Sequence, residues 1–413
     1  MICTYLRSSS ASTFEFCPIK YAITSIFGLP EPPNPKTQVG TICHKNFEIL
    51  GKIKRAQQDN KENYVDDIVG DIDVNNYDFE KIMRAVYDYY YEKSEITKER
   101  RIKFQEKGYC EELFPLIFRK DYVKSNFYLK GKFEDGVPKV YPELTQRLKD
   151  LRNGSTDYTI DELIHLYREP DFRKSRLWTL KAIEYDNGAY DPRNKNIVDA
   201  EVRFDVTLDY EWAKYKYSTH HGEIEGQLQL FGTIDQISSI SPTVYEIFDL
   251  KTGKRFSWSK EIVKSPEELK KDFQLRLYHY VCHKLYPNVE QFLTVIFFFN
   301  DGGPFSLFWG KEDLQETENM IREKFEDIKN TIIPAQHKSW KCKSFCHMSK
   351  PCTTHSHLIP IIETREGQMS KVGEPMSTCD YFAKAMQTRP MEKVLEHMTK
   401  PGHSFSYYSP PGA

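Results

Sequence analysis

Two neighbouring stretches carry the strongest signal for the fold: Gly232-Thr-Ile-Asp235 and Glu246-Ile-Phe-Asp249-Leu-Lys251. A short connection separates them. Each lies in an alternation of apolar and polar residues that is typical of a β-strand. Since the side chains of a strand point alternately to its two faces, Asp249 and Lys251 point the same way. The connection is short enough for a hairpin, so we expect Asp235 to lie near Asp249 across the sheet. Two carboxylates and one lysine would then converge on one point.

Such a group of side chains suits the hydrolysis of a phosphodiester. Carboxylate oxygens are hard ligands that bind Mg²⁺ or Mn²⁺. The ion neutralises charge that develops on the phosphate and lowers the pKa of a water molecule. A lysine beside it positions that water, helps to deprotonate it, or stabilises the transition state. The alternative is a solvent-facing salt bridge, because the pattern Asp-x-Lys occurs often by chance.

Elements on both sides of these strands extend the pattern into an α/β fold. Strands are expected over residues 198–208, 225–237, 243–250, 292–299 and 305–309. Helices are expected over residues 8–29, 39–56, 266–285 and 311–332. Their order predicts a mixed central β-sheet flanked by helices.

Composition divides the chain into four parts. Residues 60–195 are polar and charged without a clear strand pattern, and they predict a mostly helical insertion. The core would combine the N-terminal helices of residues 1–59 with the strands and helices of residues 196–355. Residues 356–413 form a tail that we expect to lie partly loose on the surface.

Further residues on nearby helices and strands are candidates for the same site. His44, on the helix over 39–56, offers an imidazole as a metal ligand, and Glu48 follows one turn later on the same face. Gln274 and Tyr278 are also one turn apart, on the helix after the acid–lysine strand, where they would reach DNA or brace Lys251. Glu201, in an earlier strand, is a further candidate carboxylate. Taken singly, each of these residues is explained equally well by ordinary packing or exposure.

The ordered set of a helix histidine, a GxxD strand, a (D/E)xK strand and a QxxxY helix resembles the RecB-like branch of the PD-(D/E)XK nucleases. The resemblance covers about residues 8–56 and 198–352, and it implies a restriction-endonuclease-like core. It implies that His44, Asp235, Asp249 and the carbonyl near Leu250 bind the metal. Asp235, Asp249 and Lys251 would be catalytic. Gln274, Tyr278 and Glu201 would contact DNA or support the site.

A group of cysteines suggests a second metal centre. Cys342, Cys346 and Cys352 are clustered, and Cys17 stands far upstream. Four thiolates suit an iron–sulfur cluster or zinc. The group resembles that of RecB-like nucleases, including CRISPR-associated exonucleases and AddB-type helicase–nucleases, which implies a 4Fe-4S cluster. The middle spacing is three residues here rather than the usual two, and Zn²⁺, with His347 or His355 nearby, is the alternative.

The other cysteines, Cys3, Cys43, Cys110, Cys282 and Cys379, show no ligand spacing and are expected to be structural. A total of nine in a chain without a recognisable signal peptide favours thiols or metal binding over disulfides. We expect a cytoplasmic protein, in the host cytoplasm if it is phage-encoded.

Charge and missing motifs restrict the function further. The net charge is −2, so a DNA-binding surface must be local, and Lys98–Lys107 and Arg119–Lys132 are candidates for it. No apolar run of about 18 residues predicts a membrane span. The sequence has neither a Walker-A motif nor a glycine-rich dinucleotide loop. Unwinding of DNA would therefore need a partner, such as a helicase or another recombination or replication protein.

These observations predict a Mg²⁺- or Mn²⁺-dependent deoxyribonuclease. The resemblance favours an exonuclease that acts on single-stranded DNA ends in recombination, replication or repair. A structure-specific endonuclease is one alternative. A non-catalytic, metal-stapled DNA-binding or scaffold protein is another, although the intact Asp235, Asp249 and Lys251 argue against it.

Overall fold

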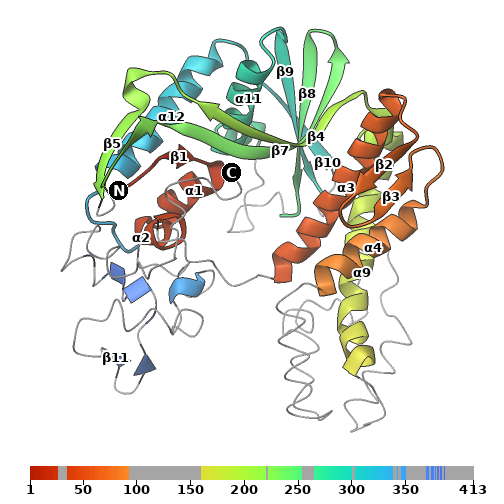
Figure 1. Cartoon of the computed structure of the whole chain (residues 1–413), viewed down its shortest axis with the longest axis horizontal. Coiled ribbons are helices and arrows are strands. Elements are labelled where there is room, and N and C mark those ends of the chain that lie inside the picture. Colours follow the sequence, from red (N-terminus) through yellow and green to blue (C-terminus); the bar gives the residue numbers. More distant parts are fainter. Residues whose placement is uncertain are drawn as a thin grey trace.

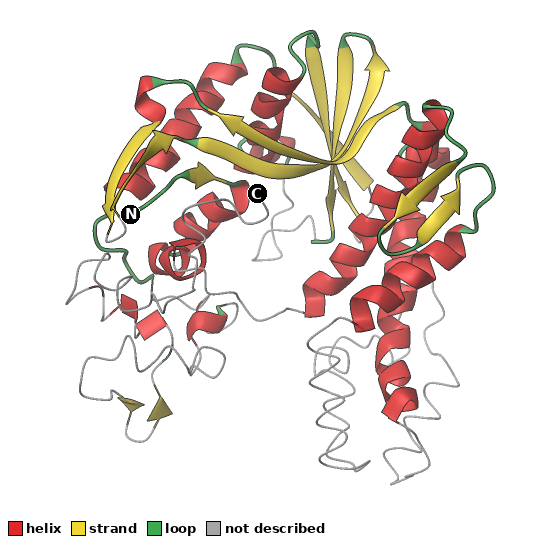
Figure 2. Cartoon of the chain, viewed as in Figure 1, coloured by secondary structure: helices red, strands yellow, loops and turns green. Residues whose placement is uncertain are grey.

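The computed structural model describes most of the predicted core. It covers residues 1–26, 35–92, 160–219, 222–253, 265–299 and 303–337, and then residues 342, 346–349, 369–371, 374–375, 377, 379–380, 382–383 and 386. Both basic stretches and Cys352 lie outside the described residues. Helices and strands alternate in a mixed α/β fold (Figures 1 and 2). Within these ranges, every helix is too short or too polar to cross a membrane.

A six-stranded mixed sheet forms the centre of the fold. Its strands, in spatial order, are β1 (Tyr5–Leu6), β7 (Gln229–Ser241), β8 (Val244–Lys251), β9 (Gln291–Phe298) and β10 (Gly303–Phe308), and β4 (Ile197–Thr207) also pairs with β7. The β4–β7, β7–β8 and β9–β10 pairs are antiparallel, whereas β8 and β9 are parallel. A parallel pair needs a long crossover connection, and the chain between β8 and β9 carries two helices.

Helices cover the sheet on two sides, which confirms the predicted mixed sheet flanked by helices (Figure 1). On one side are α3 (Pro35–Gln58), α4 (Phe79–Glu92) and α9 (Ile160–Glu184). Phe47 and Leu50 of α3 pack there on Phe248 and Phe297 of the sheet. On the other side are α1 (Ser8–Phe16), α11 (Phe273–Leu285) and α12 (Asp313–Asn330), whose apolar residues share one core with the opposite face of β7.

Two predicted helices are interrupted, each at an identifiable residue. The helix expected over 8–29 breaks at Cys17, because a proline disfavours helical backbone in the residue before it. Pro18 then starts the short helix α2 (Pro18–Tyr21), and a π-helical turn, η1 (Ala22–Ile26), follows. The helix expected over 266–285 splits into α10 (Pro266–Leu269) and α11, because the Asp272 carboxylate accepts hydrogen bonds from the first amides of α11 at 2.9 and 3.2 Å.

The strand expected over 225–237 is also divided. It consists of β6 (Gly222–Gln227), which pairs with β5 (Lys214–Thr219), and of β7, which pairs with β4. The division falls at Leu228, which is fully buried and bonds through its amide and carbonyl to Ala213 and Leu208. The chain changes its pairing partner from β5 to β4 at this one buried residue, and the apolar–polar alternation of the sequence does not show such a change.

Residues 60–195, which were predicted as a mostly helical insertion, also contain a pair of strands. Strands β2 (Asn63–Asp66) and β3 (Gly70–Asp73) form an antiparallel hairpin. Its turn has local signals: Gly70 takes φ +84°, and the Asp66 carboxylate accepts hydrogen bonds from the amides of Ile68 and Val69. The two strands are short and charged, so they carry no apolar stripe that would have indicated them.

Three of the described apolar residues in the tail are buried. Cys379, Phe382 and Met386 are 6%, 0% and 4% exposed and belong to the same core as α1 and α11. Their spacing is that of one helix face, a signal too short to stand out. The remaining short elements are η4 (Tyr185–Gly188), η5 (Pro192–Asn194), η6 (Glu211–Ala213), η7 (His347–Ser349), β11 (Met369–Lys371) and β12 (Glu374–Pro375).

Candidate functional site

Three acidic residues stand in a row across adjacent strands of the sheet. In the register of β4 and β7, Glu201 lies opposite Asp235. In the register of β7 and β8, continued one residue beyond its last pair, Asp235 lies opposite Asp249. Glu201 has φ +55°, a conformation that residues other than glycine rarely adopt and that clusters at functional sites. The row therefore includes one residue held in a strained backbone conformation.

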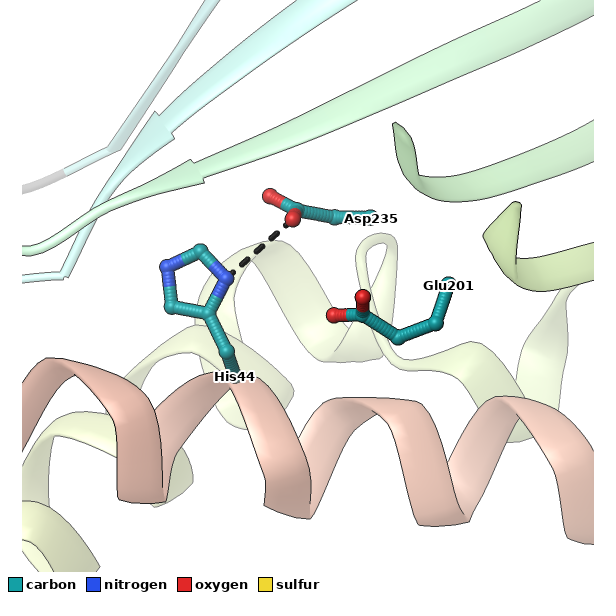
Figure 3. A group of neighbouring side chains, drawn as sticks. All are labelled: His44, Glu201 and Asp235. Carbon is teal, nitrogen blue, oxygen red and sulfur yellow. Dashed lines mark hydrogen bonds and ion pairs between the residues drawn. The ribbon is translucent and has the colours of Figure 1, made fainter. Parts of the chain in front are cut away.

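Helix α3 brings an imidazole to this row (Figure 3). The Nδ1 atom of His44 lies 3.2 Å from Oδ1 of Asp235. The other oxygen of Asp235 accepts a hydrogen bond of 2.6 Å from the amide of Leu250. Ligand atoms of His44, Glu201 and Asp235 all lie within 4.8 Å of one another, and no other such group occurs in the described part of the chain. The structure thus joins α3, β4 and β7 at one point.

Two glycines allow α3 to approach the strands this closely. A Cβ atom on Gly40 would lie 2.8 Å from the Thr252 hydroxyl oxygen, at the end of β8. A Cβ atom on Gly51 would lie 2.9 Å from the Ala200 methyl group, on β4 beside the row of acids. Because the glycines flank the histidine on the same helix, they set its distance from the sheet.

Lys251 is held by the neighbouring carboxylate and by α11. Its Nζ atom donates to Oδ1 of Asp249 at 2.9 Å and to Oε1 of Gln274 at 3.1 Å. The side-chain nitrogen of Gln274 donates to Oδ1 of Asp249 at 3.2 Å and to the Tyr278 hydroxyl at 2.6 Å. That hydroxyl donates to the carbonyl of Thr233 on β7 at 2.7 Å. A continuous chain of hydrogen bonds therefore fixes the position of the ammonium group.

The glycine of the GxxD stretch has a packing role that sequence reasoning missed. A Cβ atom on Gly232 would lie 2.5 Å from Cζ of Phe204 on β4. The buried Phe204 ring packs edge-on against Tyr278, with ring centroids 6.1 Å apart. Gly232 therefore leaves room for the ring that supports the tyrosine. No local signal marks Phe204, because the contact depends on strand register.

Gly232→Ala is expected to destabilise the protein by about 1–3 kcal/mol, because the added methyl group would overpack against Phe204. Urea denaturation measures the change. Gly253→Ala is the matched control, since a Cβ atom there meets nothing within 4 Å. A Gly232→Ala variant as stable as this control would contradict the packing role.

The carboxylates of the site differ in their affinity for protons. Burial raises the pKa of Asp235, but attraction to His44, a hydrogen bond from it and the charge of Lys251 together hold that pKa below its usual value. Burial raises the pKa of Asp249 to about 6, against the attraction of Lys251 and with added repulsion from Asp235. Burial and the repulsion of neighbouring carboxylates raise the pKa of Glu201 to about 7. The carboxylates of Glu201 and Asp249, each close to Asp235, are therefore stabilised either by binding a proton or by a nearby cation.

The two basic groups stay charged more readily than usual. Burial lowers the pKa of His44, but the charge and hydrogen bond of Asp235 raise it more, so the pKa lies above the usual value. Burial likewise lowers the pKa of Lys251, and Asp249 and Asp235 reverse that effect.

A divalent cation fits this donor set. Asp249 Oδ2 is buried and accepts no hydrogen bond of normal geometry, although the Lys251 ammonium lies 2.7 Å away. Carboxylates and an imidazole are ligands that Mg²⁺ and, better, Mn²⁺ accept. A cation would also favour the ionised forms of Glu201 and Asp249.

The structure brings nearly all of the predicted site residues together. His44, Glu201, Asp235, Asp249, Lys251, Gln274 and Tyr278 form one connected group, and Leu250 contributes its amide. Glu48 is paired with lysines, since one of its oxygens accepts from Lys45 at 2.9 Å and from Lys52 at 2.5 Å, and its charge adds to the repulsion at Glu201. Thr233, Phe204 and the two glycines of α3 belong to the site's support and were not predicted.

The described cysteines of the predicted second centre lie away from this row. Cys17 is buried and precedes α2, and its Sγ lies 4.0 Å from the carbonyl oxygen of Ala335. The Sγ of Cys342 donates to the carbonyl of His337, and the amide of Cys346 donates to the carbonyl of Cys342. The fourth predicted ligand, Cys352, lies outside the described residues.

Comparison with known proteins gives one family. The sequence pattern of the PD-(D/E)XK nuclease superfamily matches residues 144–353, just over half of the 413 residues. The match includes the three acids of the row, Lys251 and the α11 residues, whereas His44 precedes it. No curated protein matches the chain significantly.

Proposed function

The chain belongs to the PD-(D/E)XK nuclease superfamily, and on that premise we propose that it is an exonuclease acting on single-stranded DNA ends. Membership makes it a metal-dependent nuclease. The observation that carries the proposal at this site is the meeting of the His44–Glu201–Asp235 group with the hydrogen-bonded Asp249–Lys251 pair.

We assign the metal to His44, Glu201 and Asp235, with Asp249 beside them as a further carboxylate. A bound Mg²⁺ or Mn²⁺ would stabilise the charge that develops on the phosphate and lower the pKa of a nearby water. The strained backbone of Glu201 supports its inclusion, and Figure 3 shows its carboxylate directed toward His44 and Asp235. The backbone of Leu250 contributes by holding Asp235 in place through its amide.

Lys251 acts as a cationic donor in this proposal. Burial lowers its pKa, but the charges of Asp249 and Asp235 raise it above the usual value, which favours the protonated form in the metal-free protein. Its ammonium group would orient the attacking water or stabilise the phosphate charge. Gln274 and Tyr278 position that group through the hydrogen bonds that connect it to β7.

The finer assignments rest on the resemblance to RecB-like nucleases. We propose cytoplasmic action on DNA in recombination, replication or repair, with a helicase or another such protein as partner. A structure-specific endonuclease is the alternative within the nuclease class. The cysteine group adds a proposed 4Fe-4S cluster, with Zn²⁺ as the alternative; its ligands from sequence are Cys17, Cys342, Cys346 and Cys352.

A comparison of linear and circular single-stranded DNA tests the mode of cleavage. The protein is incubated with each substrate in Mn²⁺, in Mg²⁺ and in EDTA. An exonuclease degrades the linear strand with either or both metals and leaves the circle intact. Cleavage of the circle would favour the endonuclease. Binding without degradation of either substrate would favour the non-catalytic scaffold.

The raised pKa of Glu201 predicts a pH-dependent stability. Its pKa rises from 4.5 to about 7 in the folded chain, so the folded state binds more protons than the unfolded state between these values. The metal-free protein is therefore expected to lose stability as pH rises from about 5 to about 7. A bound metal must displace these protons, so Mn²⁺ should raise the melting temperature more at pH 8 than at pH 6.

Thermal unfolding in EDTA and in Mn²⁺ across this pH range measures both effects. The Glu201→Gln variant lacks the titrating carboxyl, so it should show a smaller loss of stability with pH in EDTA. It should also show a smaller stabilisation by Mn²⁺. Identical pH profiles for the variant and the wild type would contradict the assignment of Glu201.

A further inference from the structure

Cysteine side chains from three distant parts of the chain gather around one short segment, Ala335–His337. The Sγ atom of Cys17 lies 4.0 Å from the carbonyl oxygen of its first residue. The Sγ atom of Cys379 accepts a hydrogen bond of 3.1 Å from the side-chain amide of Gln336. The Sγ atom of Cys342 donates to the carbonyl of the third at 3.0 Å. Each of the three residues of this segment is therefore in contact with one cysteine side chain.

A fourth cysteine, Cys346, is hydrogen-bonded to Cys342 beside this segment. Its amide donates to the carbonyl of Cys342 at 3.3 Å, and the Ser349 hydroxyl donates to the carbonyls of both cysteines at 2.5 and 2.8 Å. Cys346 is 5% exposed and belongs to the same buried cluster as Cys17 and Cys379. None of the four forms a disulfide bond.

The surroundings of Cys379 differ from those of the isolated buried cysteines. Burial raises the pKa of its thiol, the hydrogen bond from Gln336 lowers it, and the neighbouring Cys17 and Cys346 add to the rise. Burial also raises the thiol pKa values of Cys43 and Cys282, but no other cysteine contributes to either. Cys379 is therefore one of a group of thiols, whereas Cys43 and Cys282 are single packing residues.

We propose that Cys379 is a thiolate ligand of the cysteine-bound metal centre and completes a set with Cys17, Cys342 and Cys346. It takes the place that sequence spacing gave to Cys352. The inference rests on the metal centre of the proposed function and is independent of the nuclease chemistry. Four soft thiolates suit an iron–sulfur cluster or Zn²⁺, and each thiol must release its proton to solvent on binding.

The contacts of the tail support this ligand. The Gln336 amide that donates to Cys379 also donates to the Asp380 carboxylate at 2.8 Å, and the Ser377 hydroxyl donates to that same carboxylate at 2.6 Å. Phe382 anchors the following turn in the core with no exposed surface. Coordination at Cys379 would connect this tail to the start of the chain, a constraint on the unfolded state that favours folding.

Metal analysis of the full chain, purified without oxygen, tests the inference. Iron, acid-labile sulfide and zinc are measured per chain, together with absorbance near ~400 nm, where iron–sulfur proteins absorb. Cys379→Ser is expected to lose most of the bound metal, whereas Cys352→Ser and the buried control Cys282→Ser keep it. Full metal content in Cys379→Ser would overturn the inference, as would a wild type that stays metal-free after reconstitution with iron and sulfide or with zinc.

Alkylation of the wild type covers the case in which Cys379→Ser does not fold. In the metal-loaded protein, Cys379 should resist iodoacetamide. After chelation the tail is no longer held to the rest of the chain and can open transiently, so the buried thiol should react, as judged by mass spectrometry. Cys282 should remain unmodified in both states. Reactivity of Cys379 that does not depend on chelation would overturn the inference. Since neither readout involves cleavage, a failure here is distinguishable from a failure of the nuclease assignment.

Discussion

Lys251→Met is expected to lower the rate of DNA cleavage by about 10²- to 10⁴-fold and to leave DNA binding in place. The ammonium group is the cation that Asp249 and Gln274 hold at the site, and methionine keeps the length of the side chain without the charge. Without its partner, the buried Asp249 would bind a proton more strongly and become a poorer neighbour for a metal. Single-turnover cleavage and a separate binding assay measure the two quantities.

Lys195→Met is the matched control for this substitution. Lys195 lies 2.8 Å from the carboxylate of Glu246, which is 4% exposed on the same strand as Asp249. Both variants break an ion pair with a buried carboxylate of β8, which costs up to about 3–5 kcal/mol of stability. Only Lys251→Met should lose cleavage. Equal losses of cleavage in the two variants would mean that stability, and not chemistry, explains the effect.

Asp235→Asn is expected to weaken Mn²⁺ binding by at least about 10- to 100-fold and to abolish most cleavage. Asparagine keeps an oxygen that accepts the amide of Leu250, so the strand geometry is preserved. It removes the charge that attracts both a cation and the His44 proton. The pKa of His44, which Asp235 raises, should therefore fall. Calorimetric Mn²⁺ titration and NMR of the imidazole measure these changes.

Asp66→Asn is the matched control, because it also neutralises a buried carboxylate but at a position outside the proposed metal site. Asp66 is 3% exposed and its carboxylate lies 2.9 Å from the ammonium of Lys45, so it is also paired with α3. The control should bind Mn²⁺ as the wild type does and leave the pKa of His44 unchanged. Wild-type Mn²⁺ affinity in Asp235→Asn would remove Asp235 from the proposed ligands.

The parts of the fold with strong local patterns were predictable from sequence. The alternation around Asp249 gave the strand, and the short connection before it gave the hairpin that places Asp235 opposite. The helix predicted over 266–285 is split, because the Asp272 carboxylate caps α11, and an aspartate at that position is a local signal for a helix start. The hairpin β2–β3 was missed because its strands are too polar to show an apolar face.

The parts of the site that depend on long-range contacts were not predictable. The approach of His44 to Asp235 was expected only from the family resemblance, since helical periodicity does not say which strand a helix crosses. The close fit of α3 requires Gly40 to face Thr252, just after β8, and Gly51 to face Ala200 on β4. The left-handed conformation of Glu201 has no sequence signal.

Crystals soaked in Mn²⁺ and measured at a wavelength where manganese scatters anomalously would locate the metal. We expect one strong anomalous peak within coordination distance, about 2.0–2.3 Å, of the side chains of His44, Glu201 and Asp235. Manganese bound only at surface carboxylates, with His44 still hydrogen-bonded to Asp235, would rule out this metal site.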